Sequence, residues 1–221
     1  MKVDISKTSG KSSGKKITLS DKIFGIEPND HAIYLDINGN TFDPQNGYIR
    51  YFGDNKCRNV VPEIKEGNKI LEIGCGWGGF AEFLAKKYDV SIDCITISKN
   101  QYDFTKKRIF KSGLNNKVNV KFLDYRDVKD KYDHVASIEM IEAVGENYMD
   151  KYFQTIKKVL NNNGTAAIQG IVIKDELFER YRANEDFIQK YIFPGGFLPS
   201  INFMEKLIKK NNLKIEKINT Y

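Results

Sequence analysis

The sequence predicts an α/β protein built on a doubly wound, mostly parallel sheet. From residue 69 onward, short apolar runs rich in β-branched residues alternate with segments of helical period. The first apolar run leads directly into four glycines, at positions 74, 76, 78 and 79. A strand, a glycine turn and a helix in this order are typical of a site for a nucleotide-type ligand. Glycine lets the backbone approach the ligand closely, and the first N–H groups of the helix are free. We expect the strand order 3-2-1-4-5 with helices on both faces.

The glycine turn has a tighter spacing than the dinucleotide fingerprint Gly-x-Gly-x-x-Gly. It reads Gly74-x-Gly76-x-Gly78, with Glu72 two residues before the first glycine. This pattern resembles the first motif of class I methyltransferases, which bind S-adenosylmethionine. We expect the turn, with Cys75 inside it, to pass under the amino-acid end of that ligand and the Glu72 carboxylate to reach its ammonium group. A generic Rossmann-type turn for another ligand remains the alternative.

Composition places few further bounds on the chain. Its 221 residues suit one domain with an appendage, 41% of them are apolar, and the net charge of +6 permits an anionic surface or substrate. Three cysteines, Cys57, Cys75 and Cys94, are an odd number without metal-ligand spacing. We therefore expect a reduced, cytoplasmic protein with no metal site. We find no apolar run of transmembrane length and no signal peptide.

The chain divides into three segments of different character. Residues 1–38 form an amino-terminal extension with a basic, Ser- and Gly-rich tail, and residues 17–36 resemble the amino terminus of bacterial large-subunit ribosomal protein four. The RNA-binding loop of that family does not follow, and residues 1–36 hold six Lys against five acidic residues, so we expect no specific nucleic-acid partner. A gene fusion or an assembly artefact explains this extension. Residues 39–68 are a turn-rich lead-in with a short helix at 48–61, and residues 69–221 form the main domain.

The second and third expected strands end in polar residues. The second, at 90–97, precedes Ser98, a plausible N-cap of a helix through Phe110. No acidic residue stands at its tip, so Thr96 and Gln101 are the groups available for a ribose, unless Thr96 and Ser98 only cap the helix. The third strand, at 119–123, ends in Asp124 and Tyr125, which suit an adenine amino group and ring.

The fourth strand, at 133–140, ends in two carboxylates. Glu139 and Glu142 lie three residues apart at the sheet edge where open α/β sheets hold ligands. Either could hold a cation, a water molecule or a bicarbonate proton, and helix capping is an equal alternative. A helix over about 146–160, a turn at 161–164 and a fifth strand at 165–173 complete this part.

Residues 60–200 together resemble the cyclopropane-fatty-acyl-phospholipid synthase and mycolic acid cyclopropane synthase family. The resemblance rests on five stretches of sequence, at 71–79, 96–101, 124–127, 137–145 and 191–200. The Gly-Cys-Gly-Trp-Gly turn together with Ile-Phe-Pro-Gly-Gly is highly specific. A class I methyltransferase fold follows from the resemblance.

The resemblance implies a reaction and a set of site residues. The family transfers a methyl group from S-adenosylmethionine to the cis double bond of a phospholipid acyl chain, and loss of a proton closes a cyclopropane ring. The implied base is a bicarbonate held by Glu142, with Gln169 as the second catalytic position. The expected cofactor site comprises Glu72, Gly74, Cys75, Gly76, Gly78, Thr96, Ile97, Ser98, Gln101, Asp124, Tyr125, Arg126 and Ile138. The apolar segment 187–198 suits a lipid-facing slot, although we expect Ile192 to pack in the core.

Three departures from the family pattern qualify these expectations. Gln169 stands where the family has a histidine, and glutamine cannot carry a positive charge. Methylation without ring closure, or a methylene-branched product, is therefore an alternative. The family's Tyr-Ser-Cys entry segment is not found before Val60, and Cys57 is not in that context. After a helix at 206–211 and a sixth strand at 213–218, nothing remains for a seventh strand or for the family's catalytic tyrosine.

We therefore expect a core that is incomplete at its carboxyl-terminal strands, with an exposed edge at the fifth strand. A fragment that binds the cofactor without catalysis is a second hypothesis. A nucleic-acid-binding protein is a third, which the complete glycine motif opposes. The expected partners are unsaturated phospholipid acyl chains at the inner face of a membrane, where the protein would be peripheral. A homodimer is an assembly that the sequence leaves open.

Overall fold

The computed structural model describes residues 64–184 and 187–218. The predictions for residues 1–38, for the helix at 48–61, for Cys57 and for most of the lead-in lie outside this range. The resemblance of the extension to a ribosomal protein is therefore still only a prediction.

Five parallel strands form one sheet in the described part of the chain. They are β1 Lys69–Ile73, β2 Ser91–Thr96, β3 Val118–Phe122, β4 Tyr132–Ile138 and β5 Leu160–Gln169. Their order, β3-β2-β1-β4-β5, confirms the predicted order 3-2-1-4-5. The expected turn at 161–164 lies within the bounds of β5, where the pairing with β4 shifts between Tyr132 and His134.

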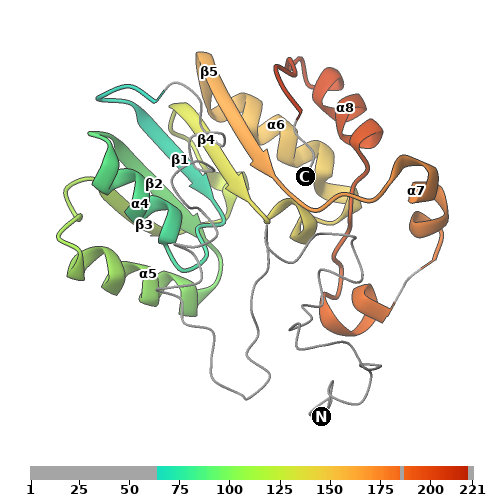
Figure 1. Ribbon diagram of the computed structural model, residues 1–221, viewed down its shortest axis with the longest axis horizontal. Coiled ribbons are helices and arrows are strands. Elements are labelled where there is room, and N and C mark those ends of the chain that lie inside the picture. Colours follow the sequence, from blue (N-terminus) through green and yellow to red (C-terminus); the bar gives the residue numbers. More distant parts are fainter. Residues whose placement is uncertain (1–63, 185–186, 219–221) are drawn as a thin grey trace, which may run out of the picture. The chain divides into compact units, whose positions relative to one another are not determined.

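Helices cover both faces of this sheet, and alternate residues of β1 show it. Leu71 and Ile73 belong to one buried cluster with Tyr152 and Phe153 of α6 Met149–Val159. Glu72 points the opposite way and meets the backbone of Ala81 in α4 Gly79–Lys87. α5 Lys99–Lys111 joins α4 on that second face, because Thr105 and Arg108 contact the glycine turn and Glu82. Figure 1 shows α4 and α5 beside β1, β2 and β3, and α6 beside β4 and β5.

The segment after β5 differs most from expectation. It contains α7 Asp175–Arg182 and a π-helical turn, η5 Ile188–Ile192, neither of which the sequence analysis predicted. α8 Ile201–Lys210 begins five residues earlier than expected, because the Ser200 side chain accepts a hydrogen bond from the Phe203 N–H and caps it. The prediction of a sixth strand at 213–218 is wrong. A strand needs a ladder partner, and none of the described strands pairs with this stretch.

The fifth strand ends four residues earlier than predicted, at Gln169, and Ile173 forms only an isolated bridge with Ser200. Within the described residues β5 pairs on one side only, with β4, as the prediction of an open edge requires. α8 packs instead against α6, where the Lys210 ammonium lies 2.8 Å from the Asp150 carboxylate. Among the described residues, no helix is long and apolar enough to cross a membrane.

Candidate cofactor and catalytic site

The glycine turn connects β1 to α4 through backbone conformations that favour glycine. Gly74, Gly76 and Gly78 have φ angles of 79°, 50° and 78°. The N–H groups of Gly74 and Cys75 donate to the Ile95 carbonyl at 3.0 and 2.9 Å, which ties the turn to the end of β2. A Cβ added at Gly74 would lie 2.7 Å from the Met140 side chain, so the turn also sits tightly against the end of β4. Sequence spacing alone located this turn.

Glu72 lies beneath the turn, inside the layer between β1 and α4. Its side chain is 3% exposed, and burial raises the pKa of its carboxyl well above the usual value. One oxygen accepts from the Ala81 backbone N–H, near the start of α4, and the other has no partner among the described residues. Glu72 therefore holds the first turn of α4 from below. Its predicted contact with a ligand ammonium group stays a prediction.

Cys75 and Cys94 are both buried, with free thiols that lie side by side. The neighbouring Cys75 sulfur, together with burial, raises the pKa of the Cys94 thiol well above its usual value. The Cys94 thiol is therefore an apolar packing group under the turn.

The polar residues after β2 gather at the carboxyl end of that strand. The Thr96 hydroxyl lies 2.7 Å from the Gln101 side-chain oxygen and also accepts from the Ser98 N–H at 3.1 Å. Ser98 caps α5, as predicted, by accepting from the Gln101 N–H. Ile97 is 71% exposed beside them. Thr96 and Ser98 thus do cap and brace the turn, which was the alternative left open, and their part in ribose binding stays a prediction.

After β3, the predicted adenine-binding group forms the short helix η2 Tyr125–Asp127. The Arg126 guanidinium lies 2.9 and 2.6 Å from the Asp124 oxygens and holds the pKa of that carboxyl below its usual value. The Tyr125 ring packs edge-on against Tyr152, with 5.7 Å between ring centroids. Asp124 therefore already has a charged partner, but its carboxylate keeps free lone pairs for an amino group.

The end of β4 holds the second part of the site. Ile138 is buried opposite Gln169 of β5, and the backbone N–H of Glu139 donates to the Gln169 carbonyl at 2.9 Å. Glu139 has a φ of 48°, an uncommon value outside glycine, so the chain turns sharply here. This turn places Glu142, in η3 Ile141–Ala143, at the ends of β4 and β5. The structure thus brings Glu142 and Gln169 to neighbouring strand ends, as their predicted roles require.

Glu142 is held by contacts that sequence reasoning missed. One carboxylate oxygen accepts from the Ile171 N–H, and the other is buried without a partner among the described residues. Burial raises the pKa of Glu142 to about 7, and the nearby Glu139 charge adds to the shift. The carboxyl therefore exchanges a proton near neutral pH. The contact with Ile171 leaves no sequence signal, because a backbone group of any residue provides it.

The Pro-Gly-Gly stretch of the family motif packs directly on this turn. The Phe197 N–H donates to the Glu142 carbonyl at 2.9 Å. Gly145 has a φ of 75°, and a Cβ there would lie 3.2 Å from the Gly195 carbonyl oxygen, so glycine favours this close approach of the two backbones. The motif thus fixes the position of the Glu142 turn.

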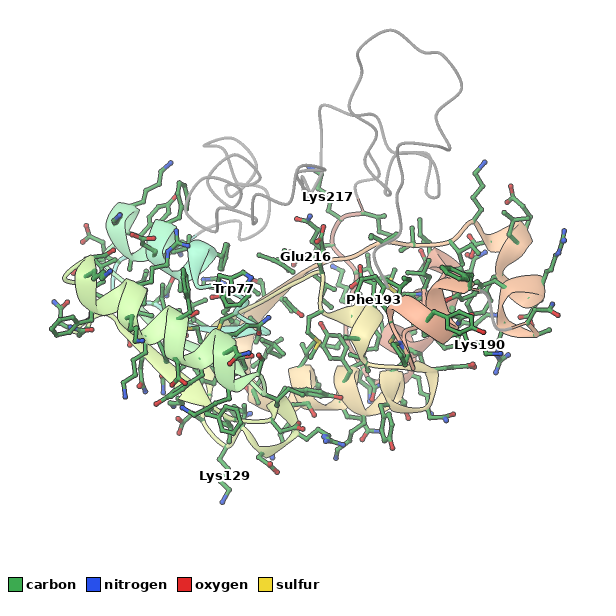
Figure 2. All side chains as sticks on the ribbon, turned by 90° about the horizontal axis from the view of Figure 1, so that it is seen from below. Trp77, Lys129, Lys190, Phe193, Glu216 and Lys217 are labelled. Atoms are coloured by element: carbon green, nitrogen blue, oxygen red, sulfur yellow. The ribbon has the colours of Figure 1, made fainter. Side chains whose placement is uncertain are left out.

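The apolar segment before that motif faces outward. Phe187, Tyr191 and Phe193 are each more than 60% exposed, whereas Phe197 is buried against Phe178. The prediction that Ile192 packs in the core is wrong, since it is 50% exposed. The π-helical turn η5 carries its side chain to the surface. Figure 2 shows Phe193 and Lys190 together on this segment, and Trp77 beside α4 and α5 on the other side of the view.

Comparison with known proteins gives a consistent family assignment. The family model described as mycolic acid cyclopropane synthetase matches residues 54–221. The chain is 38% identical over 140 residues to a tuberculostearic acid methyltransferase from Mycobacterium tuberculosis, covering 63% of this chain and 33% of that protein. It is 39% identical over 140 residues to the cyclopropane-fatty-acyl-phospholipid synthase of Escherichia coli strain K12, covering 63% and 34%.

Solved structures agree with the fold. A mycolic acid cyclopropane synthase complexed with SAH and CTAB superposes with a TM-score of 0.65 at 25% identity, covering 73% of this chain and 61% of that one. The chain spans about a third of the length of the curated relatives it matches.

Proposed function

This chain belongs to the mycolic acid cyclopropane synthetase family, and we propose that it binds S-adenosylmethionine and transfers its methyl group to the double bond of an unsaturated acyl chain in a phospholipid. The observation that carries the proposal is Glu142. It is a buried carboxyl with a pKa of about 7, one oxygen fixed and one free, on a turn that packs close to the glycine turn. The Met140 side chain lies between the two turns, against Gly74.

The cofactor site proposed is the set predicted from the sequence. The glycine turn would lie under the amino-acid end, Thr96, Ile97 and Gln101 would meet the ribose, and Asp124 with Tyr125 and Arg126 would meet the adenine. When bound, S-adenosylmethionine supplies a methyl group on an electrophilic sulfonium. Because an alkene is a weak nucleophile, the site must hold both reactants close and aligned. The tight contacts of the glycine turn with β2 and β4 provide a rigid support for this.

Methyl addition leaves a carbocation on the acyl chain, so a proton acceptor must be close and water must be excluded. Loss of a proton from the added methyl carbon, with closure of the carbon–carbon bond, gives the cyclopropane. With a pKa of about 7, Glu142 can hold a bicarbonate through a shared proton or accept the proton itself. The proposal that bicarbonate is the base rests on the family resemblance. Gln169, on the adjacent strand end, would orient that base by hydrogen bonding.

Methyl transfer without ring closure is a second candidate function. Glutamine at position 169 and the similarity to a tuberculostearic acid methyltransferase both favour it. Mass spectrometry of the lipid product decides between the two, since a cyclopropane and a methylene-branched chain differ in their fragmentation and a saturated methyl branch is two hydrogens heavier. A requirement for a reductant would point to the saturated product.

The first experiment is calorimetric titration of the whole chain with S-adenosylmethionine, followed by an assay on unsaturated phospholipid with and without bicarbonate. We expect binding on the order of micromolar and a product 14 mass units heavier than the substrate. Binding without product would favour the cofactor-binding fragment. No binding in a chain that melts cooperatively would exclude the proposed function.

The lipid partner suggests a surface for membrane contact. We propose that Phe187, Tyr191 and Phe193 insert among lipid headgroups, with Lys190 beside them, because exposed aromatic side chains and a cation suit that boundary. Co-sedimentation with anionic vesicles tests this. Phe193→Ser should weaken vesicle binding several-fold and leave cofactor affinity unchanged. Equal vesicle binding by the native protein and by Phe193→Ser would refute the contact.

A further inference from the structure

Three buried oxygen atoms near the end of β4 have no hydrogen-bond partner among the described residues. They are the Ser137 hydroxyl, the Tyr152 hydroxyl and the free oxygen of Glu142. Ser137 and Tyr152 are fully buried. Burying a hydroxyl without a partner costs about 1–3 kcal/mol, so three such atoms in one place are unusual in a native protein.

The three groups come from three elements, β4, α6 and η3, and both Ser137 and Glu142 lie near Tyr152. Ser137 follows Val135 by two residues on β4, so both point toward α6, where Val135 shares a buried cluster with Tyr152. Burial raises the pKa of Tyr152, the adjacent Ser137 hydroxyl lowers it, and the Glu142 charge raises it further. Tyr152 thus lies near both Ser137 and Glu142. Its hydroxyl stays protonated at neutral pH and remains a donor.

Among the described residues, the free oxygen of Glu142 has no hydrogen-bond partner. The Ile171 N–H binds the opposite oxygen, and Glu139 is acidic and disfavours the charged form. Tyr125, packed edge-on against Tyr152, closes the cluster on the side of η2. A donor on the free oxygen would stabilise the carboxylate and fix its orientation.

We propose that Tyr152 is a positioning residue for Glu142, backed by Ser137. The Ser137 hydroxyl donates toward the Tyr152 oxygen, and the Tyr152 hydroxyl donates toward the free oxygen of Glu142, directly or through one buried water molecule. This relay would set the proton affinity of Glu142 and aim its carboxylate at the ends of β4 and β5. The role of this relay in catalysis rests on the proposed function, whereas the existence of the hydrogen bonds does not depend on it.

The test is a double-mutant cycle at several pH values on the whole chain. Urea unfolding of the native protein and Glu142→Gln, from about pH 5 to pH 8, gives the midpoint at which Glu142 loses its proton. The same comparison is then made between Tyr152→Phe and the double variant Tyr152→Phe/Glu142→Gln. Loss of the relay removes a donor from the charged form, so the midpoint should rise by about half to one pH unit. Tyr152→Phe should also lower the melting temperature by a few degrees.

A matched control is Tyr132→Phe, which removes the hydroxyl of another fully buried tyrosine. Tyr132 donates to Asp93 at 2.7 Å, on a side chain the relay does not touch. This variant should lose stability with the Glu142 midpoint unchanged. Ser137→Ala provides a second route if Tyr152→Phe does not fold, and it should move the midpoint in the same direction by a smaller amount.

The opposite result is equally clear. If Tyr152→Phe melts at a higher temperature than the native protein and Ser137→Ala leaves the Glu142 midpoint unchanged, the relay does not exist. The two hydroxyls would then be unpaired and destabilising. Where the native protein methylates lipid, the acid limb of kcat/KM should shift with the same midpoint while S-adenosylmethionine affinity stays constant. A shifted midpoint in a protein without methyl transfer would uphold the relay and refute the proposed function.

Discussion

Glu82 in α4 and Glu142 in η3 are the same residue type, and their environments are opposite. Glu82, in α4, accepts hydrogen bonds from Lys86, Arg108 and Ser112. Burial alone would raise the pKa of Glu82, but these partners outweigh it and hold the value at about 2. Glu142 accepts from the Ile171 backbone N–H, and burial raises its pKa to about 7. Pairing makes the first carboxylate a structural tie between α4 and α5, and incomplete pairing leaves the second available for chemistry.

The two halves of the candidate site differ in the same way. The glycine-turn half is built from backbone groups whose hydrogen bonds are made within the chain. The half around Glu142 holds three buried oxygens without a partner among the described residues, against one, on Glu72, beneath the glycine turn, and it stands beside exposed aromatic side chains. The comparison teaches that the first half is suited to hold a ligand and the second to react with one.

The largest expected effect is that of a substitution in the glycine turn. Gly74→Ala adds a Cβ that meets the Met140 side chain at 2.7 Å, in a backbone with φ of 79°. We expect a loss of stability of about 2–4 kcal/mol and loss of S-adenosylmethionine binding, measured by urea unfolding and calorimetry. Gly113→Ala is the control, because Gly113 has a φ of 67° with open space around it and should cost only about 1 kcal/mol. Equal losses in both variants would mean that contact with Met140 is unimportant.

A second prediction sharpens the contrast through Glu142. Its folded pKa of about 7 lies above the usual 4.5, so the folded state binds the extra proton between these pH values. Its contribution to stability is therefore complete below pH 4.5 and is lost as the pH rises through 7. Glu142→Gln should equal the native protein near pH 4 and exceed it by about 3 kcal/mol near pH 8.

The same variant should form no lipid product and bind S-adenosylmethionine with nearly native affinity. Urea unfolding against pH, with calorimetry at pH 8, checks both parts. A stability difference that does not change with pH would contradict the environment described for Glu142, and parallel loss of product and cofactor binding would show a structural role.

The smallest effect concerns Glu82 and has the opposite sign. Its folded pKa of about 2 lies below 4.5, so its contribution is present above pH 4.5 and is lost as the pH falls through 2. Glu82→Gln should destabilise the protein by about 1–2 kcal/mol at pH 7, after allowance for solvent screening. The deficit should shrink below about pH 4 in thermal melts. A deficit that persists at low pH would point to packing in place of charge.

Much of the fold was predictable because its signals are local. The glycine spacing, the Ser98 cap and the alternation of strands and helices gave the order β3-β2-β1-β4-β5 correctly. Apart from the turn expected at 161–164, which lies inside β5, the errors of element type fall after β5. The sixth strand at 213–218 was predicted from its pattern, but a strand forms only where another strand accepts its hydrogen bonds. Ile192 is apolar, and periodicity could not show that a π-helical turn carries it outward.

By itself, the sequence determined the family, the sheet order and the residues at the strand ends, because glycine conformation and apolar periodicity act over a few neighbouring residues. Only the tertiary structure decided which polar atoms are paired. The Ile171 N–H on Glu142, the Arg126 partner of Asp124 and the cluster of Ser137 with Tyr152 depend on how α6 and β5 pack on the sheet. Burial and distance set the proton affinity of a carboxyl, and neither is a property of its position in the chain.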